Sequence, residues 1–237
     1  MSSTRARPHH RFTDDGRRVR EVLTYARRGS RLSEKQATAW VEYADEWVIP
    51  DAAVDGEFVV ADWFGRSADL IVEIGSGVGE ATVATAAARP DVNVLAFEVW
   101  RPGVADTLAR VGAAGVQNVR LLQVDAVWSM AHLFAPASIS ELHTWFPDPW
   151  HKARHHKRRL VNPDFAELAA SRLVVGGTWR LATDWADYGE VMLEVLGKVD
   201  LLEGGVVDRC EGRPLTKFER KGRAAERVIT DLAYVRR

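Results

Sequence analysis

The stretch Leu-Ile-Val-Glu-Ile-Gly-Ser-Gly-Val-Gly-Glu, residues 70–80 of a chain of 237, decides the fold. Its first five residues, Leu70 to Ile74, are mostly apolar and predict a short buried β-strand. Gly75, Gly77 and Gly79 then predict a tight turn, because glycine adopts backbone conformations closed to other residues. The alanine-rich residues 80–88 that follow predict a helix, which Pro90 ends. Strand, glycine turn and helix in this order indicate an α/β fold.

The same alternation continues on both sides of this stretch. We expect further strands at 92–97, 119–124, 139–145 and 178–182, with one or two more near the C-terminus. We expect helices at 104–111, 126–134, 164–173 and 188–199, the third closed by a Gly176–Gly177 turn, and an earlier helix that Ser33 caps. The pattern predicts a Rossmann-like, doubly wound and mainly parallel sheet of about seven strands, with helices on both faces.

Composition gives the outline of the molecule. With 46% hydrophobic residues, the chain can bury one domain, and its net charge of -1 indicates no partner by itself. The charge is uneven, however, because the first 35 residues hold ten Lys or Arg and four acids. We expect residues 1–30 to be a basic, flexible arm and residues 31–237 to form a single domain.

Several classes of protein are disfavoured. Cys210 is the only cysteine, so no intramolecular disulfide can form and a reducing compartment is expected. The N-terminus lacks the apolar core of a signal peptide, and no apolar run approaches the roughly 20 residues of a membrane span. We therefore expect a cytoplasmic protein that has no membrane partner and is a monomer or a homodimer.

The spacing of the glycines bears on the ligand. Dinucleotide enzymes use G-x-G-x-x-G, which places a pyrophosphate on a helix N-terminus. Here the third glycine comes one residue early, and Glu80 in the first helical turn would repel a pyrophosphate. Glu73, just before the turn, could meet a cation. A ligand with a positive charge and no phosphate fits these residues, as S-adenosylmethionine does, although a tight turn without any ligand remains open.

Two more acids end the next two strands. Glu98 stands about 20 residues beyond the glycines, where an acid commonly accepts hydrogen bonds from both ribose hydroxyls. Asp125 ends the third strand and could bind the adenine amino group. Either could be an ordinary carboxylate. Together with Glu73, they favour S-adenosylmethionine, bound by Glu73, Gly75, Gly77, Gly79, Glu98 and Asp125.

The fourth strand leads into Trp145-Phe146-Pro147-Asp148-Pro149-Trp150. Prolines on both sides of Asp148 fix the backbone and exclude a helix there. The segment holds one carboxylate at the end of the strand beside aromatic rings that could stack on a base. A solvated loop aspartate is the alternative interpretation.

A dense basic run follows directly. Five permanent cations and three histidines occur without an acid, namely His151, Lys152, Arg154, His155, His156, Lys157, Arg158 and Arg159. Such a run can be a solvated surface, but its position beside Asp148 favours a polyanionic substrate. The crowded cations oppose a metal ion at the histidines, so we expect no metal.

These motifs resemble those of the bacterial tRNA (guanine-N7-)-methyltransferases, from about Arg28 to the C-terminus. The matching segments are E-I-G-S-G-V-G at 73–79, F-E-V at 97–99, V-D-A at 124–126, F-P-D-P-W-H-K-A-R-H-H-K-R-R at 146–159, A-T-D-W at 182–185 and T-K-F-E at 216–219. The F-P-D-P-W-H-K block is highly specific, whereas the glycine turn alone indicates only a methyltransferase.

The resemblance implies a class I methyltransferase fold and a role for each matching residue. Asp148 would be catalytic and would also line the S-adenosylmethionine site with Glu73, Glu98 and Asp125. Guanosine would contact Lys152, Asp184, Thr216, Lys217, Phe218 and Glu219. The tRNA would contact Arg154, His155, His156, Lys157, Arg158 and Arg159. The family methylates guanosine 46 in the variable loop of tRNA.

Some features depart from the family pattern or leave alternatives open. Trp100 stands where a smaller polar residue is common, which could reshape the adenosine pocket, and the arm before Arg28 lies outside the secure match. The alternatives are a methyltransferase acting on another RNA or a small molecule, and an RNA-binding module without activity. A nicotinamide dehydrogenase is disfavoured by the glycine spacing.

Overall fold

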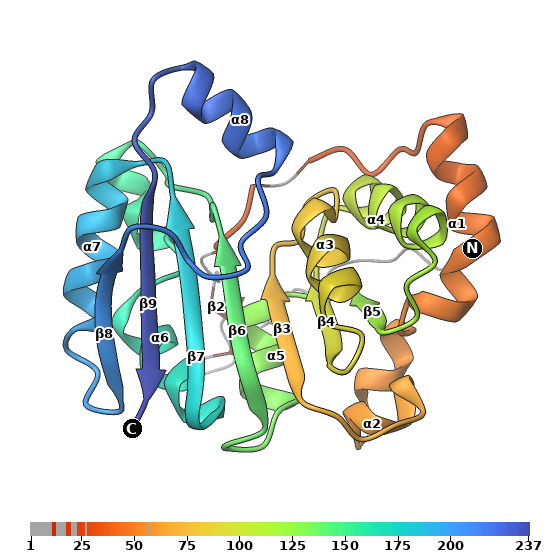
Figure 1. Cartoon of the computed structure of the whole chain (residues 1–237), viewed down its shortest axis with the longest axis horizontal. Helices are drawn as coiled ribbons and strands as arrows, with labels where there is room; N and C mark the ends of the chain where they lie inside the picture. The colour runs from red at the N-terminus through yellow and green to blue at the C-terminus, as the bar shows by residue number, and fades with distance from the viewer. Residues whose placement is uncertain (1–10, 13–17, 20–22, 27, 56) are drawn as a thin grey trace.

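A computed structural model describes residues 11–12, 18–19, 23–26, 28–55 and 57–237 (Figure 1). Its centre is a seven-stranded sheet in the order β5-β4-β3-β6-β7-β9-β8. The strands are β3 (Leu70–Ile74), β4 (Asn93–Phe97), β5 (Val119–Leu122), β6 (Ile139–Trp145), β7 (Leu173–Thr183), β8 (Leu202–Val207) and β9 (Thr230–Arg236). Within this sheet β9 runs antiparallel to both of its neighbours. The predicted doubly wound, mainly parallel sheet of about seven strands is confirmed.

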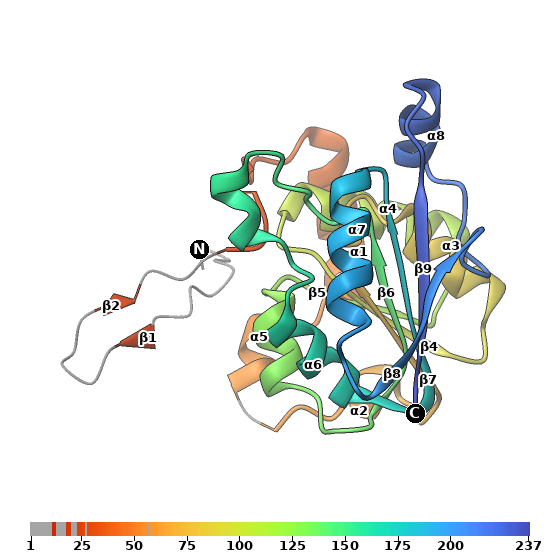
Figure 2. The same ribbon diagram turned by 90° about the vertical axis from the view of Figure 1, so that its left-hand side faces the viewer.

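Helices cover both faces of the sheet (Figure 2). They are α1 (Glu34–Trp47), α2 (Val60–Phe64), α3 (Glu80–Ala88), α4 (Arg101–Ala114), α5 (Ala126–His132), α6 (Pro163–Arg172), α7 (Ala186–Leu196) and α8 (Lys217–Ala224), with 3-10 turns η1 (Asp51–Asp55) and η2 (Ala153–Arg158). Residues of α1, α3 and α4 bury one apolar cluster against the sheet. Residues of α5, α6 and α7 bury a larger one. Both faces are thus covered, which is why the central strands β3 and β4 are buried along their whole length.

The topology also places the site. Strand β3 pairs with β4 on one side and β6 on the other, so the strand order reverses there. Ligands of open α/β sheets bind at the carboxyl ends of the strands beside such a switch point. In Figure 1 the carboxyl ends of β3 and β6 point to the upper edge of the molecule, and α8 lies above that edge.

The N-terminal region is described in part. Strands β1 (Arg11–Phe12) and β2 (Arg18–Val19) pair antiparallel in a separate two-stranded sheet. Most of the predicted flexible arm, residues 1–10, 13–17, 20–22 and 27, lies outside the described residues. Residues 23–26 and 28–29 are described, and we call them the N-terminal strap. Helix α1 begins as predicted, with Ser33 forming a capping box with Gln36.

One local prediction needs correction, and two elements were not predicted. Helix α6 ends at Arg172 and β7 begins at Leu173, so Gly176 and Gly177 lie inside a strand rather than in a turn that closes the helix. The reason is a register irregularity between β6 and β7, which Gly176 accommodates with a φ of 80°. Helix α8 and the turn η2 were not predicted, because both are highly charged and lack an apolar stripe.

Candidate active site

The glycine turn between β3 and α3 also contacts β4 and α4. Gly75, Gly77 and Gly79 have φ values of 76°, 59° and 77°, in the left-handed region that favours glycine. The N–H groups of Gly75 and Ser76 both donate to the carbonyl of Phe97, at 2.8 and 3.1 Å, which ties the turn to the end of β4. A Cβ on Gly79 would lie 2.5 Å from Thr107 of α4. Gly79 therefore packs the turn against α4, whereas Gly75 and Gly77 line the cavity described below.

Glu73 is a buried carboxylate at the end of β3. Its side chain accepts a hydrogen bond from the hydroxyl of Thr82 at 3.0 Å, and the residue is 2% exposed. Burial raises the pKa of Glu73 to about 7, with Thr82 opposing that rise and Glu98 adding to it. Among the described residues, no Lys or Arg forms an ion pair with it. Such a carboxylate suits the cationic end of a ligand.

Glu98 and Asp125 each bind the backbone as well as lining the cavity. The two carboxylate oxygens of Glu98 accept hydrogen bonds from the N–H groups of Gly77 and Trp100, both at 2.7 Å. Burial raises the pKa of Glu98, and these two N–H groups oppose the rise. Asp125 caps α5 by accepting from the N–H of Trp128 at 3.0 Å. Because each carboxylate oxygen has further lone pairs, hydroxyl and amino groups of a ligand can still be bound.

These side chains surround one cavity of about 690 Å³. This volume lies in the range of small-molecule and cofactor sites. The cavity brings together most of the predicted cofactor residues with several predicted substrate residues, namely Glu73, Gly75, Gly77, Glu98, Asp125, Asp148, Asp184, Thr216, Lys217 and Phe218. The buried hydroxyl of Ser76, which has no hydrogen-bond partner in the structure, also lines it. Buried acids, an unpaired hydroxyl and glycine backbone fit S-adenosylmethionine.

Asp148 lies in a strained segment after β6. Phe146 and Trp150, on either side of Pro147-Asp148-Pro149, have φ values of 51° and 49°. Positive φ at bulky residues costs energy and often marks a functional site. No helix forms between Phe146 and Trp150, as predicted. Asp148 Oδ2 accepts a hydrogen bond from the N–H of Ala26 at 3.0 Å.

The N-terminal strap lies against the same segment. Arg158 donates to the carbonyls of Leu23 and Tyr25, both at 2.8 Å, and its guanidinium lies 3.5 Å from the ring centre of Trp150. Trp150 Nε1 donates to the carbonyl of Thr24 at 3.0 Å. The departure that the sequence shows at Trp100 has a structural consequence, because its Nε1 donates to Gly29 at 2.9 Å. Thr24, Tyr25, Ala26 and Arg28 of the strap line the cavity.

The strap residues were missed as site residues by sequence reasoning. Their contacts come mainly from backbone groups, which carry no signal of residue type. Only the charge of Arg28, whose guanidinium lies 5.4 Å from the Trp100 ring centre, could have indicated them.

The residues of the basic run differ in exposure: its first cations face solvent, whereas Arg158 and Arg159 pack against other parts of the protein. Lys152, Arg154 and Lys157 are exposed, and His155 and His156 are half-buried. Burial and the neighbouring Arg154 lower the pKa of His155. Arg158 is half-buried against the strap. Arg159 is 3% exposed, donates to the carbonyl of Pro149 at 2.9 Å and pairs with Asp187.

The prediction that Arg159 contacts tRNA therefore needs correction, because its guanidinium already has partners inside the protein. Its hydrogen bond also lowers the pKa of Asp187.

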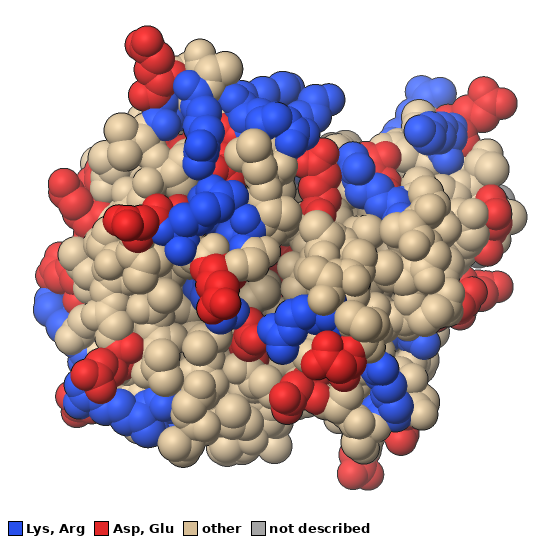
Figure 3. Space-filling model, viewed as in Figure 1, with Lys and Arg blue, Asp and Glu red and all other residues tan. Residues whose placement is uncertain are grey.

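Helix α8 places its first residues over the cavity. Thr216 caps the helix by accepting from the N–H of Glu219 at 3.2 Å. Lys217 and Phe218 are exposed, and the Phe218 ring lies 5.0 Å from that of Phe146. Asp184, after β7, pairs with Arg227 beyond the end of α8. The Lys and Arg side chains gather over α8 and the loop before it at the upper edge of the molecule (Figure 3).

Glu219 is the second predicted substrate residue that the structure buries. It is 0% exposed, pairs with Arg209 at 2.8 Å and with Arg213, and Arg213 in turn pairs with Asp231 at 2.7 Å. Burial alone would raise the pKa of Glu219, but the hydrogen bonds from Arg209 and Arg213 hold it below its ordinary value. Glu219 is fully buried and does not line the cavity, so the predicted direct contact with guanosine is not possible in this arrangement.

Other chemistries find less support in the described part of the chain. Cys210 is buried, and burial raises its pKa to about 12, so it holds no thiolate for nucleophilic attack. No group of three or more His, Cys, Asp or Glu side chains among the described residues is arranged to hold a metal ion. Within the same residues, every helix is too short or too polar to cross a membrane.

Comparison with known proteins shows the family of the chain. A family model described as "Putative methyltransferase" matches residues 67–232. A tRNA (guanine-N(7)-)-methyltransferase of Nocardioides sp. is 68% identical over 98% of this chain and 94% of its own. The chain belongs to the tRNA (guanine-N7-)-methyltransferase family. A relative of the same name from Cutibacterium acnes is 44% identical over 93% of this chain and 86% of its own.

Solved structures support the fold of this family member. The 16S rRNA methyltransferase KamB superposes with a TM-score of 0.56 at 16% identity, over 77% of this chain and 96% of its own. A 16S rRNA (adenine(1408)-N(1))-methyltransferase from Catenulisporales acidiphilia gives 0.52 at 14% identity, over 74% of this chain and 89% of its own. At this identity the likeness shows the class I methyltransferase fold alone.

Proposed function

We propose that this chain transfers the methyl group of S-adenosylmethionine to N7 of a guanosine in tRNA, at position 46 of the variable loop. The observation that carries the proposal is that one cavity joins the acids Glu73, Glu98 and Asp125 to Asp148 and to the first residues of α8. The name of the 68% identical relative supports the reaction, and the family resemblance supports position 46. We also propose a cytoplasmic enzyme that acts as a monomer or a homodimer.

The cofactor end of the cavity would work through charge. S-adenosylmethionine supplies a methyl group on a positively charged sulfur. Glu73 would bind its ammonium group, Glu98 would accept from the ribose hydroxyls, and Asp125 would accept from the adenine amino group. Gly75 and Gly77 would let the ligand approach the main chain without a Cβ in the way.

Methylation at N7 does not require the protein to act as a general base. Guanine N7 presents a lone pair on the edge that faces the major groove of a helix, so no proton has to leave before transfer. The site has to align N7 with the methyl group and to stabilise the positive charge that arises on guanine. Asp148 would do both, by orienting the base and by countering that charge. The hydrogen bond from Ala26 holds its Oδ2 in place for this task.

The substrate end would position the base and the RNA. One carboxylate oxygen of Asp184 accepts a hydrogen bond from Arg227. The other oxygen would accept hydrogen bonds from the N1–H and N2–H groups of guanine. Lys152, Lys217 and Phe218 would complete the guanosine pocket. Lys152, Arg154 and Lys157, with His155 and His156, would contact phosphates, and tRNA would be selected by shape and by unstacked bases. Thr216, Arg158, Arg159 and Glu219 would act by holding these elements in place.

The test is nucleoside analysis of tRNA after reaction. Unmodified tRNA is incubated with labelled S-adenosylmethionine, digested and analysed for 7-methylguanosine, with a transcript carrying adenosine at position 46 as the matched control. We expect label in 7-methylguanosine from the guanosine transcript and none from the control. Label in another nucleoside, or equal label in both transcripts, would overturn the proposal. Binding of S-adenosylmethionine without methylation of any RNA would favour an inactive RNA-binding module.

The catalytic assignment has its own variant. Asp148→Asn keeps the shape and an acceptor for the N–H of Ala26 but removes the charge. We expect turnover to fall about 100-fold, the usual cost of losing one electrostatic contact in a transition state. Near-normal turnover of Asp148→Asn on unmodified tRNA would show the assignment to be wrong.

A further inference from the structure

Glu80 is the one acid of the glycine-turn region that the proposed reaction leaves without a task. It is the first residue of α3, directly after Gly79, and it lines the cavity. Its side chain is 20% exposed, so it is neither a solvated surface group nor a buried one. The structure shows what its carboxylate binds.

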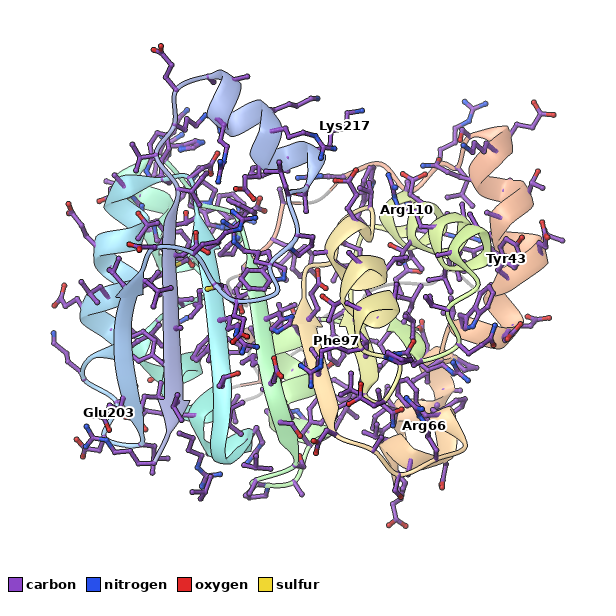
Figure 4. The ribbon with its side chains drawn as sticks, viewed as in Figure 1. Tyr43, Arg66, Phe97, Arg110, Glu203 and Lys217 are labelled. Atoms are coloured by element: carbon purple, nitrogen blue, oxygen red, sulfur yellow. The ribbon has the colours of Figure 1, made fainter. Side chains whose placement is uncertain are left out.

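The carboxylate bridges α3 to α8 and α4. Glu80 Oε2 accepts a hydrogen bond from the main-chain N–H of Lys217, the first residue of α8, across 137 positions of sequence. Its other oxygen lies 3.5 Å from Arg110 Nη2 and 4.0 Å from Arg220 Nη2. Arg110 also donates from Nε to the carbonyl of Val78 at 2.9 Å, which ties α4 to the glycine turn. Lys217 and Arg110 come from α8 and α4 to the same upper edge of the molecule (Figure 4).

The hydrogen bond to Glu80 comes from the first N–H group of helix α8. The first four N–H groups of a helix lack partners within it, and a carboxylate there also interacts favourably with the helix dipole. The side chain of Thr216 binds the N–H of Glu219, and Glu80 binds that of Lys217. Since α8 is highly charged and carries no apolar stripe, polar contacts decide where it lies. The ion pairs of Glu219 hold its buried side, and Glu80 joins its first residue to α3.

The other end of α8 is held separately. Arg227, three residues beyond the helix, pairs with Asp184, and Phe218 packs on Phe146 near the start. The two ends therefore close α8 over the cavity from opposite sides. Removal of Glu80 would break the contact of the first turn of α8 with α3 and loosen Lys217 and Phe218, although Glu219 and Phe146 still hold that turn from its other side.

We propose that Glu80 is a positioning residue for methyl transfer: its carboxylate holds the N-terminus of α8, and with it Lys217 and Phe218, over the cavity. The role rests on the proposed function, because Lys217 and Phe218 are the residues proposed to meet guanosine. Glu80 itself touches neither the base nor the methyl group. It links the turn that binds the cofactor to the helix that faces the substrate.

The first test is amide hydrogen exchange on the cofactor-free protein. Glu80→Ala removes the acceptor, and Glu80→Gln keeps an oxygen acceptor without the charge. The control Glu194→Gln removes an exposed acid of α7 that pairs with Lys198. We expect faster exchange in the first turn of α8 for Glu80→Ala, partial recovery for Glu80→Gln, and no change for Glu194→Gln. Unchanged exchange of α8 in Glu80→Ala would overturn the proposal, whatever the protein's activity.

The second test uses the N–H itself. Lys217→Pro removes the donor at a helix position that tolerates proline, and the preceding Thr216 has ψ of 162°, which suits a residue before proline. Lys217→Ala loses the same side chain but keeps the N–H. We expect Lys217→Pro to reduce kcat at least tenfold beyond Lys217→Ala, with the affinity for S-adenosylmethionine within twofold of wild type.

A double-mutant cycle completes the design. Glu80→Ala should add little to Lys217→Pro, because both remove the same bond, but should reduce kcat strongly in the Lys217→Ala background. Independent, additive effects of the two substitutions would overturn the proposal. The failures are distinguishable: a wild-type chain that leaves tRNA unmethylated fails the proposed function, whereas the exchange experiment still decides whether Glu80 holds α8.

Discussion

The main-chain N–H of Ala26 donates a hydrogen bond to Asp148 Oδ2 at 3.0 Å, across 122 positions of sequence. The proposed catalytic carboxylate is thereby oriented from outside its own loop. The N-terminal strap that supplies this bond is held mainly by Arg158 and Trp150. The basic run thus has a structural task in addition to the predicted contact with RNA.

This arrangement predicts that Arg158 supports turnover. Arg158→Ala removes two charged hydrogen bonds to the strap and the stacking on Trp150. We expect kcat on tRNA to fall at least tenfold, because one hydrogen bond to a charged group contributes about 1.5–3 kcal/mol and a tenfold loss of rate corresponds to about 1.4 kcal/mol. Arg154→Ala, in the same turn but exposed, is the matched comparison: as a proposed phosphate contact it should raise KM for tRNA while kcat at saturating tRNA stays nearly unchanged. Equal kcat values for the two variants would contradict the role given to the strap.

The exposed cations should instead control how tRNA binding depends on salt. Binding to phosphates releases counterions, so each lost phosphate contact lowers the slope of log affinity against log salt concentration by about one. The double substitution of Arg154 and Lys157 by alanine should lower this slope by about two. The affinity for S-adenosylmethionine should not change. Lys198→Ala, at an exposed lysine two residues beyond the end of α7, serves as the control. A slope equal to that of wild type would remove this surface from the tRNA interface.

The fold and the cofactor end of the site could be predicted because their signals are local in sequence. Strand β3, the glycine turn and helix α3 follow one another directly, and Glu73, Glu98 and Asp125 are placed by the strands or helices next to them. The bounds of β3, α3 and β6 agree with those expected from the pattern of apolar residues. Local periodicity is sufficient where an element is apolar and buried.

The rest of the site depends on contacts between distant segments. The bonds from Ala26 to Asp148 and from Lys217 to Glu80 involve backbone N–H groups, which every residue except proline has. The identity of the donor residue therefore does not predict these hydrogen bonds. Arg159 and Glu219 show the converse. The basic run predicted a surface role for Arg159 and the family resemblance one for Glu219, but ion pairs with Asp187, 28 positions away, and with Arg213, six positions away, accompany the burial of both side chains. A charged residue in a basic or helical run is therefore no evidence of exposure until its partner is known.

The buried network around Glu219 predicts a large effect on stability. Arg213 is 5% exposed and pairs with both Glu219 and Asp231. Arg213→Ala leaves two buried carboxylates short of a partner, which costs about 3–5 kcal/mol of unfolding free energy. Arg237→Ala, which breaks an exposed pair with Glu203, should cost less than about 1 kcal/mol. Urea unfolding followed by tryptophan fluorescence measures both. Similar losses for the two variants would show that burial does not set the strength of the network.

The pKa of Glu73 predicts how pH affects stability and cofactor binding. Its folded pKa of about 7 lies above its ordinary value of 4.5, so its contribution to stability is present below about pH 4.5. This contribution is lost as pH rises through 7. Without cofactor, wild type should therefore lose thermal stability relative to Glu73→Gln between pH 5 and 8.

Cofactor binding should show the opposite trend, because the ammonium of S-adenosylmethionine favours the ionised carboxylate. We expect the affinity of wild type to fall by up to about tenfold for each pH unit below 7, whereas Glu73→Gln binds weakly with little dependence on pH. Calorimetric titration at pH 5.5, 6.5 and 7.5 measures both proteins. Parallel pH profiles for wild type and Glu73→Gln would mean that Glu73 does not bind the ammonium group, and that its burial serves only the packing of β3 against α3.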